Sequence, residues 1–207
     1  MHSKLIKYSL KAYLLIIINL CFLFKVNAQT TNISGVVNSY VSVSSLAFQS
    51  VVAPSSTGFV VGDKVLLIQM KGATIDTTNT SSFGTINSYN DAGNYEMLVI
   101  SAILSNTITF SAPILRTYNV IGLVQLVKVP VYNNVNIIGV LTCSPWNGST
   151  GGVLAFEATG NVSLNANIDV TGKGFLGGAK LSGQLGSCVG NTTGFKLPIT
   201  SLLSTNK

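Results

Sequence analysis

Hydrophobic and polar residues alternate most regularly in the stretch "VSLNANIDVT", from Val162 to Thr171. Every second residue from Val162 to Val170 is apolar, and the residues between them are Ser, Asn, Asn and Asp. Because successive side chains of a strand point to opposite faces, this pattern predicts a strand with one buried face and one solvated face. A second strand is predicted just before it, where Leu154, Phe156 and Ala158 are apolar.

Shorter apolar runs separated by turn residues fill most of the chain between residues 29 and 132. The run from Val65 to Met70 is almost continuously apolar, as is typical of a strand that is covered on both faces. Turns are predicted at Gly62-Asp63, at Asn90 to Gly93 and at Ser105-Asn106. Little of the chain has a helical period, so we expect about six strands that form a small β-sandwich or barrel.

Residues 133–207 are rich in glycine and combine short strands with small polar turns. Such a pattern is typical of a β-solenoid, in which each turn of chain buries its apolar face only against its neighbours. About three repeats are normally needed for a stable solenoid, and we expect fewer here, so the chain is predicted to be a fragment. The predicted fold is all-β, a small sandwich or barrel followed by the start of a Gly-rich β-solenoid.

The first 28 residues have the features of a secretory signal peptide. Lys4, Lys7 and Lys11 precede an apolar run from Leu14 to Phe24, and the small-residue motif Val-Asn-Ala follows. This order predicts cleavage between Ala28 and Gln29 and export to the medium or the cell surface. An uncleaved membrane anchor is the alternative, but the run is shorter than the roughly 20 apolar residues that span a bilayer.

Removal of this peptide changes the charge balance of the chain. Four of the twelve Lys and Arg residues belong to it, which leaves eight basic residues against six acidic ones. A net charge near +2 gives no basic patch of the kind that binds nucleic acid, so we expect no nucleic-acid partner.

Histidine and cysteine chemistry is sparse in the mature chain. The single histidine, His2, lies in the signal peptide, which excludes His-dependent nucleophilic catalysis and His-ligated zinc from residues 29–207. Cys143 and Cys188 remain after cleavage, and in an oxidising compartment we expect them to form a disulfide worth about 2 to 4 kcal/mol. A thiol nucleophile or a metal pair is the alternative.

Gly172, Gly174 and Gly177 spell the G-x-G-x-x-G motif of dinucleotide-binding turns directly after a predicted strand. That site also requires a helix that begins at the glycines and an acidic residue about 20 positions later. The following residues contain further glycines, and no Asp or Glu occurs after Asp169. We therefore expect no cofactor, and we interpret these glycines as tight turns and close backbone contacts.

Three residues are candidates for contact with a glycan. Glu157 and Asp169 have the opposite parity to the apolar residues of their strands, so both are predicted to point outward. They could belong to a polysaccharide-cleaving or calcium-binding site, or they could simply be solvated residues on an exposed face. Trp146 could stack on a sugar ring, or it could close the end of the solenoid core.

Three stretches carry a resemblance to a known group of proteins: "FVVGDKVLLIQMKGA", "VQLVKVPVYNNVNI" and "WNGSTGGVLAFEATGNVSLNANIDVTGKGFLGG". They resemble the N-terminal region of large, Gly-rich secreted surface proteins of Bacteroidetes, described as adhesin-like or gliding-motility proteins. The resemblance covers roughly residues 58–207. It implies a chain that continues through a long Gly-rich segment and further β-modules to a C-terminal sorting domain, and it transfers no catalytic residue.

These observations together predict an exported structural or adhesive module of the bacterial cell surface, without a catalytic site in this stretch. Surface polysaccharide or other components of the cell envelope are the expected partners. The alternative is a carbohydrate-active enzyme or a carbohydrate-binding module built on a β-solenoid, for which the few charged residues after Tyr132 would have to supply the chemistry.

Overall fold

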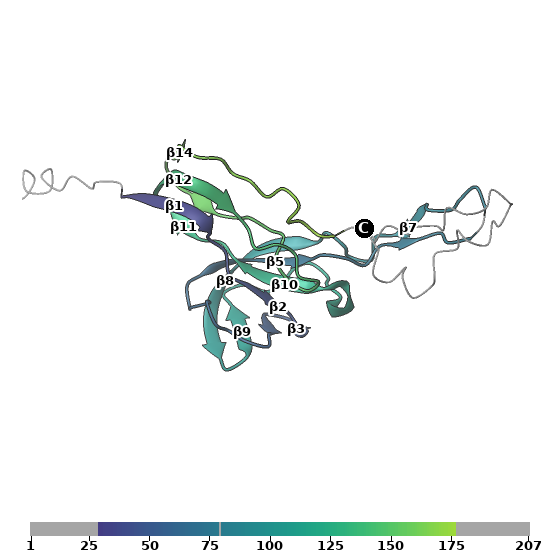
Figure 1. Cartoon of the computed structure of the whole chain (residues 1–207). Helices are drawn as coiled ribbons and strands as arrows, with labels where there is room; N and C mark the ends of the chain where they lie inside the picture. The colour runs from purple at the N-terminus through teal and green to yellow at the C-terminus, as the bar shows by residue number, and fades with distance from the viewer. Residues whose placement is uncertain (1–28, 79, 177–207) are drawn as a thin grey trace, which may run out of the picture.

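A computed structural model describes residues 29–78 and 80–176 of the chain, and within these ranges the fold is all-β (Figure 1). The one helical element described is a short 3-10 turn, η1, at Val120–Gly122. The predicted signal peptide, Gly177 and Cys188 lie outside the described residues.

The larger sheet has seven strands, all paired antiparallel, in the order β2-β10-β5-β8-β9-β4-β3. Its strands are β2 (Tyr40–Ser42), β3 (Ser45–Ala47), β4 (Ser50–Val52), β5 (Lys64–Gln69), β8 (Tyr95–Leu104), β9 (Thr107–Phe110) and β10 (Val124–Lys128). Val41 on β2, at one end of the sheet, and Val51 on β4, next to the other end, lie in the same buried cluster as Leu67 and Phe110. One face of the sheet therefore curls around this main apolar core.

Strand β5 is covered on both faces, as its continuous apolar run predicts. Val65 and Leu67 face the main core, and Leu66 belongs to a separate cluster with Val127 and Val129 on the other face. All three β5 side chains are at most 6% exposed. The turn before this strand also forms as expected, with the Asp63 carboxylate accepting a hydrogen bond from the Val60 N–H at 2.8 Å.

A second sheet has three parallel strands, β1 (Thr30–Val36), β12 (Asn134–Thr142) and β14 (Val162–Leu164), in the order β1-β12-β14. Val135 of β12 lies opposite Val162 of β14, so 27 residues separate equivalent positions. Beside it, β11 (Val131–Tyr132) pairs in parallel with β13 (Glu157–Ala158). The offset is 26 residues for β11 and β13, as in Val131 and Glu157, so the chain returns after a nearly equal length in both pairs. Parallel neighbours at a similar offset resemble solenoid rungs, so we call the β1-β12-β14 sheet the parallel stack.

The predicted division of the chain at residue 132 runs through the parallel stack. Strand β1 precedes that position and β12 follows it, yet Ile33 of β1 lies opposite Ile137 of β12. Strand β1, at the start of the described chain, therefore belongs to the parallel stack although it lies in the predicted segment 29–132. The division into residues 29–132 and 133–207 stays a prediction.

Strands β6 (Thr74–Ile75) and β7 (Ile86–Ser88) form a hairpin that projects away from both sheets (Figure 1). Phe83 and Ile86 of this hairpin are about half exposed, at 49% and 48%. The hairpin therefore adds little to either core.

The apolar face predicted for the stretch from Val162 to Thr171 is not buried. Val162, Leu164 and Ile168 are 44%, 64% and 46% exposed. They lie in register with the buried Val135, Ile137 and Leu141, so their parity is as predicted. The prediction fails because β14 is the outermost strand of the parallel stack within the described residues, and an outer strand has a neighbour on one side alone.

Candidate functional site

The segment 153–156 lies between the two sheets and contacts both. Val153 and Ala155 pack on the cluster of Leu66, Val127 and Val129 from the antiparallel sheet. Leu154 and Phe156 pack on the cluster of the parallel stack, where the Phe156 and Tyr132 rings lie 6.4 Å apart. Alternate side chains of an extended segment point to opposite faces, so "VLAF" can fill two cores at once. We call this segment and its polar partners the junction.

Asn38 fixes the junction from the link between β1 and β2. Its side chain is 7% exposed and donates hydrogen bonds to the carbonyls of Lys128, at 2.8 Å, and Ala155, at 2.5 Å. Its side-chain oxygen accepts a third from the Ala155 N–H at 3.2 Å. This side chain therefore pairs with Ala155 in the way a neighbouring strand would, which satisfies backbone groups that would otherwise be buried without partners.

Gln125 and Tyr40 hold the start of the same segment. Gln125, fully buried on β10, donates to the Gly151 carbonyl at 3.0 Å and accepts from the Gly151 N–H at 2.9 Å. The Tyr40 hydroxyl donates to the Val153 carbonyl at 2.6 Å. Burial raises the pKa of Tyr40 to about 12, so the hydroxyl keeps its proton over the physiological range.

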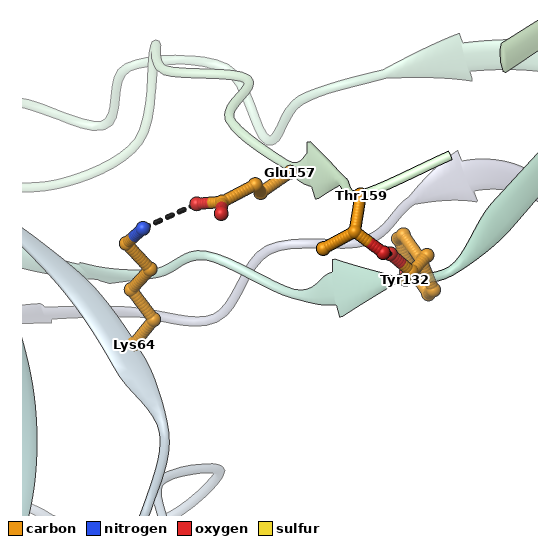
Figure 2. Close-up of polar contacts among 4 residues, drawn as sticks. All are labelled: Lys64, Tyr132, Glu157 and Thr159. Carbon is orange, nitrogen blue, oxygen red and sulfur yellow. Dashed lines mark hydrogen bonds and ion pairs between the residues drawn. The ribbon is translucent and has the colours of Figure 1, made fainter. Parts of the chain in front are cut away.

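Two ion pairs flank the junction. The Lys64 ammonium on β5 contacts the Glu157 carboxylate on β13, and thus joins the antiparallel sheet to the β11-β13 pair beside the parallel stack (Figure 2). Beside it, the backbone N–H of Thr159 donates to the Tyr132 carbonyl at 3.0 Å. Lys128 contacts Asp63 at 2.9 Å. The side chains of the Lys64–Glu157 pair are 31% and 43% exposed, so we expect the pair to contribute about 0 to 1 kcal/mol.

The three predicted glycan-contact residues have separate partners. Trp146 is 8% exposed and packs on Phe175 with ring centroids 5.2 Å apart, so its ring has little open face for a sugar. The Glu157 carboxylate forms an ion pair with Lys64, and the Asp169 carboxylate accepts a hydrogen bond from the Thr171 N–H at 2.9 Å. The hydrogen bonds from Thr171 lower the pKa of Asp169. No hydrogen bond or ion pair joins these three residues to one another in the part of the chain that the structure describes.

The cysteine and glycine predictions fall partly outside the described residues. Cys143 is buried at 1% exposure, and its predicted partner Cys188 is not described. Gly172 lies in a turn closed by the Lys173 N–H, which donates to the Val170 carbonyl at 3.1 Å, and Gly174 lies in the bend that follows. Gly172 has φ of +68°, as a tight turn requires, but a Cβ built on Gly172 or Gly174 would meet nothing within 4 Å. The close contact in this region is made by Gly152, where an added Cβ would lie 3.3 Å from the Gly174 Cα.

Residues 29–78 and 80–176 contain no group of three or more His, Cys, Asp or Glu side chains placed to hold a metal ion. No helix in these ranges is long and apolar enough to cross a membrane.

Sequence reasoning did not identify the three side chains that bond the backbone of the junction, Asn38, Tyr40 and Gln125. A signal was present for Gln125, because a glutamine inside the apolar run "VQLVKV" must find partners when the run is buried. Gln69 in "LLIQM" gives the same signal. It is 1% exposed and bonds the loops at Lys71, Asn90 and Asn119.

No protein-family model matches the chain, and no curated protein matches it.

Partial matches among solved structures include three phage tailspikes. The tailspike of Acinetobacter baumannii bacteriophage AP22, in complex with A. baumannii capsular saccharide, matches 56% of this chain at 13% identity with a TM-score of 0.33. Tailspikes of Pseudomonas phages LKA1 and phi297 match 54% and 67% of it, at 16% and 10% identity, with TM-scores of 0.27 and 0.32. The chain spans about a fifth to a quarter of their lengths, 19%, 19% and 24%. Similarity of this size does not establish a shared fold.

Proposed function

We propose that this protein is exported and serves as a structural or adhesive module of the cell surface. In this proposal the junction holds the antiparallel sheet and the parallel stack as one rigid unit. The observation that supports it most strongly is the set of side chains that bond the backbone of residues 151–155, namely the buried Asn38 and Gln125 and the half-buried Tyr40.

Buried hydrogen bonds of this kind favour a rigid structural role, because they oppose separation of the two sheets. Each contributes about 1 kcal/mol net when made, but a buried partner left alone costs about 1 to 3 kcal/mol. Separation of the two sheets would expose or orphan all of these groups at once. The junction therefore resists partial opening more strongly than the apolar contacts of four residues would alone.

The charged groups near the junction also favour a structural role over catalysis. A glycosidase places two carboxyl groups on either side of the bond that it cleaves. Here Glu157 and Asp63 each contact a lysine, and these contacts hold parts of the fold together.

Carbohydrate binding is the second candidate, and one exposed feature favours it. The Tyr95 ring on β8 is 55% exposed, and the Arg116 guanidinium lies 5.8 Å from its centroid. Met97 on the same face of β8 is 48% exposed. An aromatic ring with apolar and cationic neighbours can contact both the apolar face and the hydroxyls of a sugar. This face is a better candidate for a polysaccharide than the buried Trp146.

The test uses cells that produce the full protein. An antibody against residues 29–132 should label intact cells, and deletion of the gene should reduce attachment of the cells to a surface, with recovery on re-expression. Label that appears only after permeabilisation, or unchanged attachment of the deletion strain, would contradict the proposal. New reducing ends from a panel of polysaccharides incubated with the mature protein would favour the enzyme alternative.

A further inference from the structure

Strand β8 carries a row of exposed apolar side chains beside the junction. Tyr95, Met97 and Val99 point to the same face of the strand and are 55%, 48% and 40% exposed. Met97 lies opposite Leu66 of β5, whose side chain is buried in the cluster that the junction covers. The junction therefore covers this face of the sheet over β5 and leaves it open over β8.

The Arg116 guanidinium lies at the Tyr95 end of this row, with its Cζ 5.8 Å from the centroid of the Tyr95 ring. Arg116 is the single arginine of the chain. Within residues 29–78 and 80–176 its guanidinium makes no hydrogen bond and no ion pair, whereas Lys64 and Lys128 each contact a carboxylate. A guanidinium has five N–H donors in a planar fork, so this cation can bind an anionic ligand with all of them.

Two carboxylates hold the loop around Arg116 without contacting its guanidinium. The Glu96 carboxylate accepts hydrogen bonds from the backbone N–H groups of Leu115 and Arg116 at 3.0 and 3.3 Å. The Asp91 carboxylate accepts one from the Thr117 hydroxyl at 2.7 Å. The backbone of the loop is thus fixed to its surroundings, and the guanidinium lies against an aromatic ring. Such preorganisation lowers the entropy cost of binding a ligand.

We propose that Tyr95, Met97, Val99 and Arg116, which we call the β8 face, bind a polysaccharide whose sugars carry carboxylate groups. Arg116 binds a carboxylate through two parallel hydrogen bonds, and the Tyr95 ring contacts the apolar face of a sugar ring. Met97 and Val99 extend the apolar surface to about 14 Å from Tyr95, at about 3.4 Å per residue. This inference rests on the carbohydrate-binding candidate of the proposed function and names its class of ligand.

The closeness of the ring and the cation favours an acidic sugar over an acidic peptide. A uronic acid carries its carboxylate directly on the sugar ring, so a single unit reaches both Tyr95 and Arg116 across the 5.8 Å that separates them. The side chain of an Asp or Glu residue in a peptide would pair with the guanidinium and leave the Tyr95 ring without a contact. A neutral sugar would leave the guanidinium without its anion.

Calorimetric titration of the mature protein with polygalacturonate and with dextran tests the inference, because the first polymer consists of uronic acid units and the second is neutral. Polygalacturonate should bind at least about 10-fold more tightly than dextran. Arg116→Gln should lower the affinity for polygalacturonate at least about fivefold, and Arg116→Lys should lower it less, because lysine keeps the charge without the fork. The affinity for dextran should change little in both variants.

Matched variants elsewhere in the chain separate the β8 face from general effects of charge and exposed rings. Lys173→Gln removes the same charge from a side chain that bonds the Thr142 hydroxyl beside the parallel stack, and it should leave the affinity unchanged. Tyr95→Ala should lower the affinity at least about threefold. Phe83→Ala, at a ring that is 49% exposed on the β6–β7 hairpin, should not lower it. Urea denaturation checks that each variant is folded.

Equal affinities for the two polymers would overturn the acidic ligand and leave carbohydrate binding in place. Equal losses in Arg116→Gln and Lys173→Gln would overturn the assignment to the β8 face. Poly-L-glutamate that binds as tightly as polygalacturonate, with the same loss in Arg116→Gln, would replace the sugar by an acidic peptide. Binding of neither polysaccharide would overturn the inference together with the carbohydrate-binding candidate, and it would leave the labelling and attachment of intact cells unchanged.

Discussion

Gln125 and Gly151 exchange two hydrogen bonds across the junction, in the way that two residues of neighbouring strands do. The Gln125 side chain accepts from the Gly151 N–H at 2.9 Å and donates to its carbonyl at 3.0 Å. A buried side chain of β10 thus supplies the pairing that residue 151 lacks, and the four residues 153–156 enter between the sheets at a fixed position.

Replacement of Gln125 by leucine should lower the free energy of unfolding by about 2 to 4 kcal/mol, because the Gly151 N–H and carbonyl lose their partners inside the protein. Urea denaturation of the mature chain measures this loss. Gln49 provides the control, since its amide makes one hydrogen bond, to the Phe110 carbonyl at 2.8 Å, at a partly exposed position. Gln49→Leu should cost about 1 kcal/mol or less. Equal losses for the two variants would contradict the role given to Gln125.

Gly151 and Gly148 offer a matched pair of substitutions, because both have φ of +96°. A Cβ on Gly151 would lie 2.5 Å from the Pro145 carbonyl oxygen, whereas a Cβ on Gly148 meets nothing within 4 Å. Both alanine variants place a Cβ at a left-handed φ, which costs about 1 to 2 kcal/mol, and Gly151→Ala should lose about a further 1 to 3 kcal/mol from the clash. Thermal unfolding of the two variants compares these losses. A Gly148→Ala variant as unstable as Gly151→Ala would show that the clash is relieved at little cost.

Alkaline pH should weaken the junction through Tyr40. Its pKa is raised by burial from 10.0 to about 12, so the folded state holds this proton more tightly than the unfolded state does. The resulting stabilisation is complete below pH 10 and is lost as the pH rises from 10 to about 12. Tyr40→Phe should lack this part of the pH dependence and should also lose the hydrogen bond to Val153. Unfolding free energies of both proteins at several pH values test this, and parallel curves between pH 10 and 12 would contradict it.

The state of the two mature cysteines tests the predicted disulfide between Cys143 and Cys188. Alkylation of both cysteines in the denatured, unreduced protein would contradict this disulfide. If the cysteines form the disulfide that the exported location predicts, neither should react, and a reducing agent should lower the melting temperature. Mass spectrometry of the alkylated protein distinguishes these outcomes.

Much of the strand arrangement follows from pattern, and most of the junction does not. The continuous apolar run of β5 predicts burial on both faces, and Leu66 and Leu67 indeed face different clusters. The run "VLAF" has the same property, but only the tertiary structure shows that its two faces belong to different sheets. The pairing of Gln125 with Gly151 also depends on how the chain returns after 26 residues, which no local pattern specifies.

For the strand at Val162, the sequence predicts which side chains share a face but not whether that face is buried. Alternation correctly places Val162 and Leu164 in the same rows as Val135 and Ile137. It does not say whether a neighbouring strand covers those rows, because burial depends on the whole sheet and alternation depends on one strand. Trp146 is a similar case, since an aromatic residue in a Gly-rich loop can face solvent or close a core, and here Phe175 covers it.

Hydrogen exchange of the mature protein and of its Gln125→Leu variant tests the central claim most directly, namely that the junction makes the two sheets one cooperative unit. The account predicts that amides of Ile100 in the antiparallel sheet and Ile137 in the parallel stack exchange with the same opening free energy. It also predicts that the substitution accelerates both by the same factor. Acceleration confined to one sheet, or clearly different opening free energies in the unsubstituted protein, would show that the sheets unfold independently and would contradict the claim.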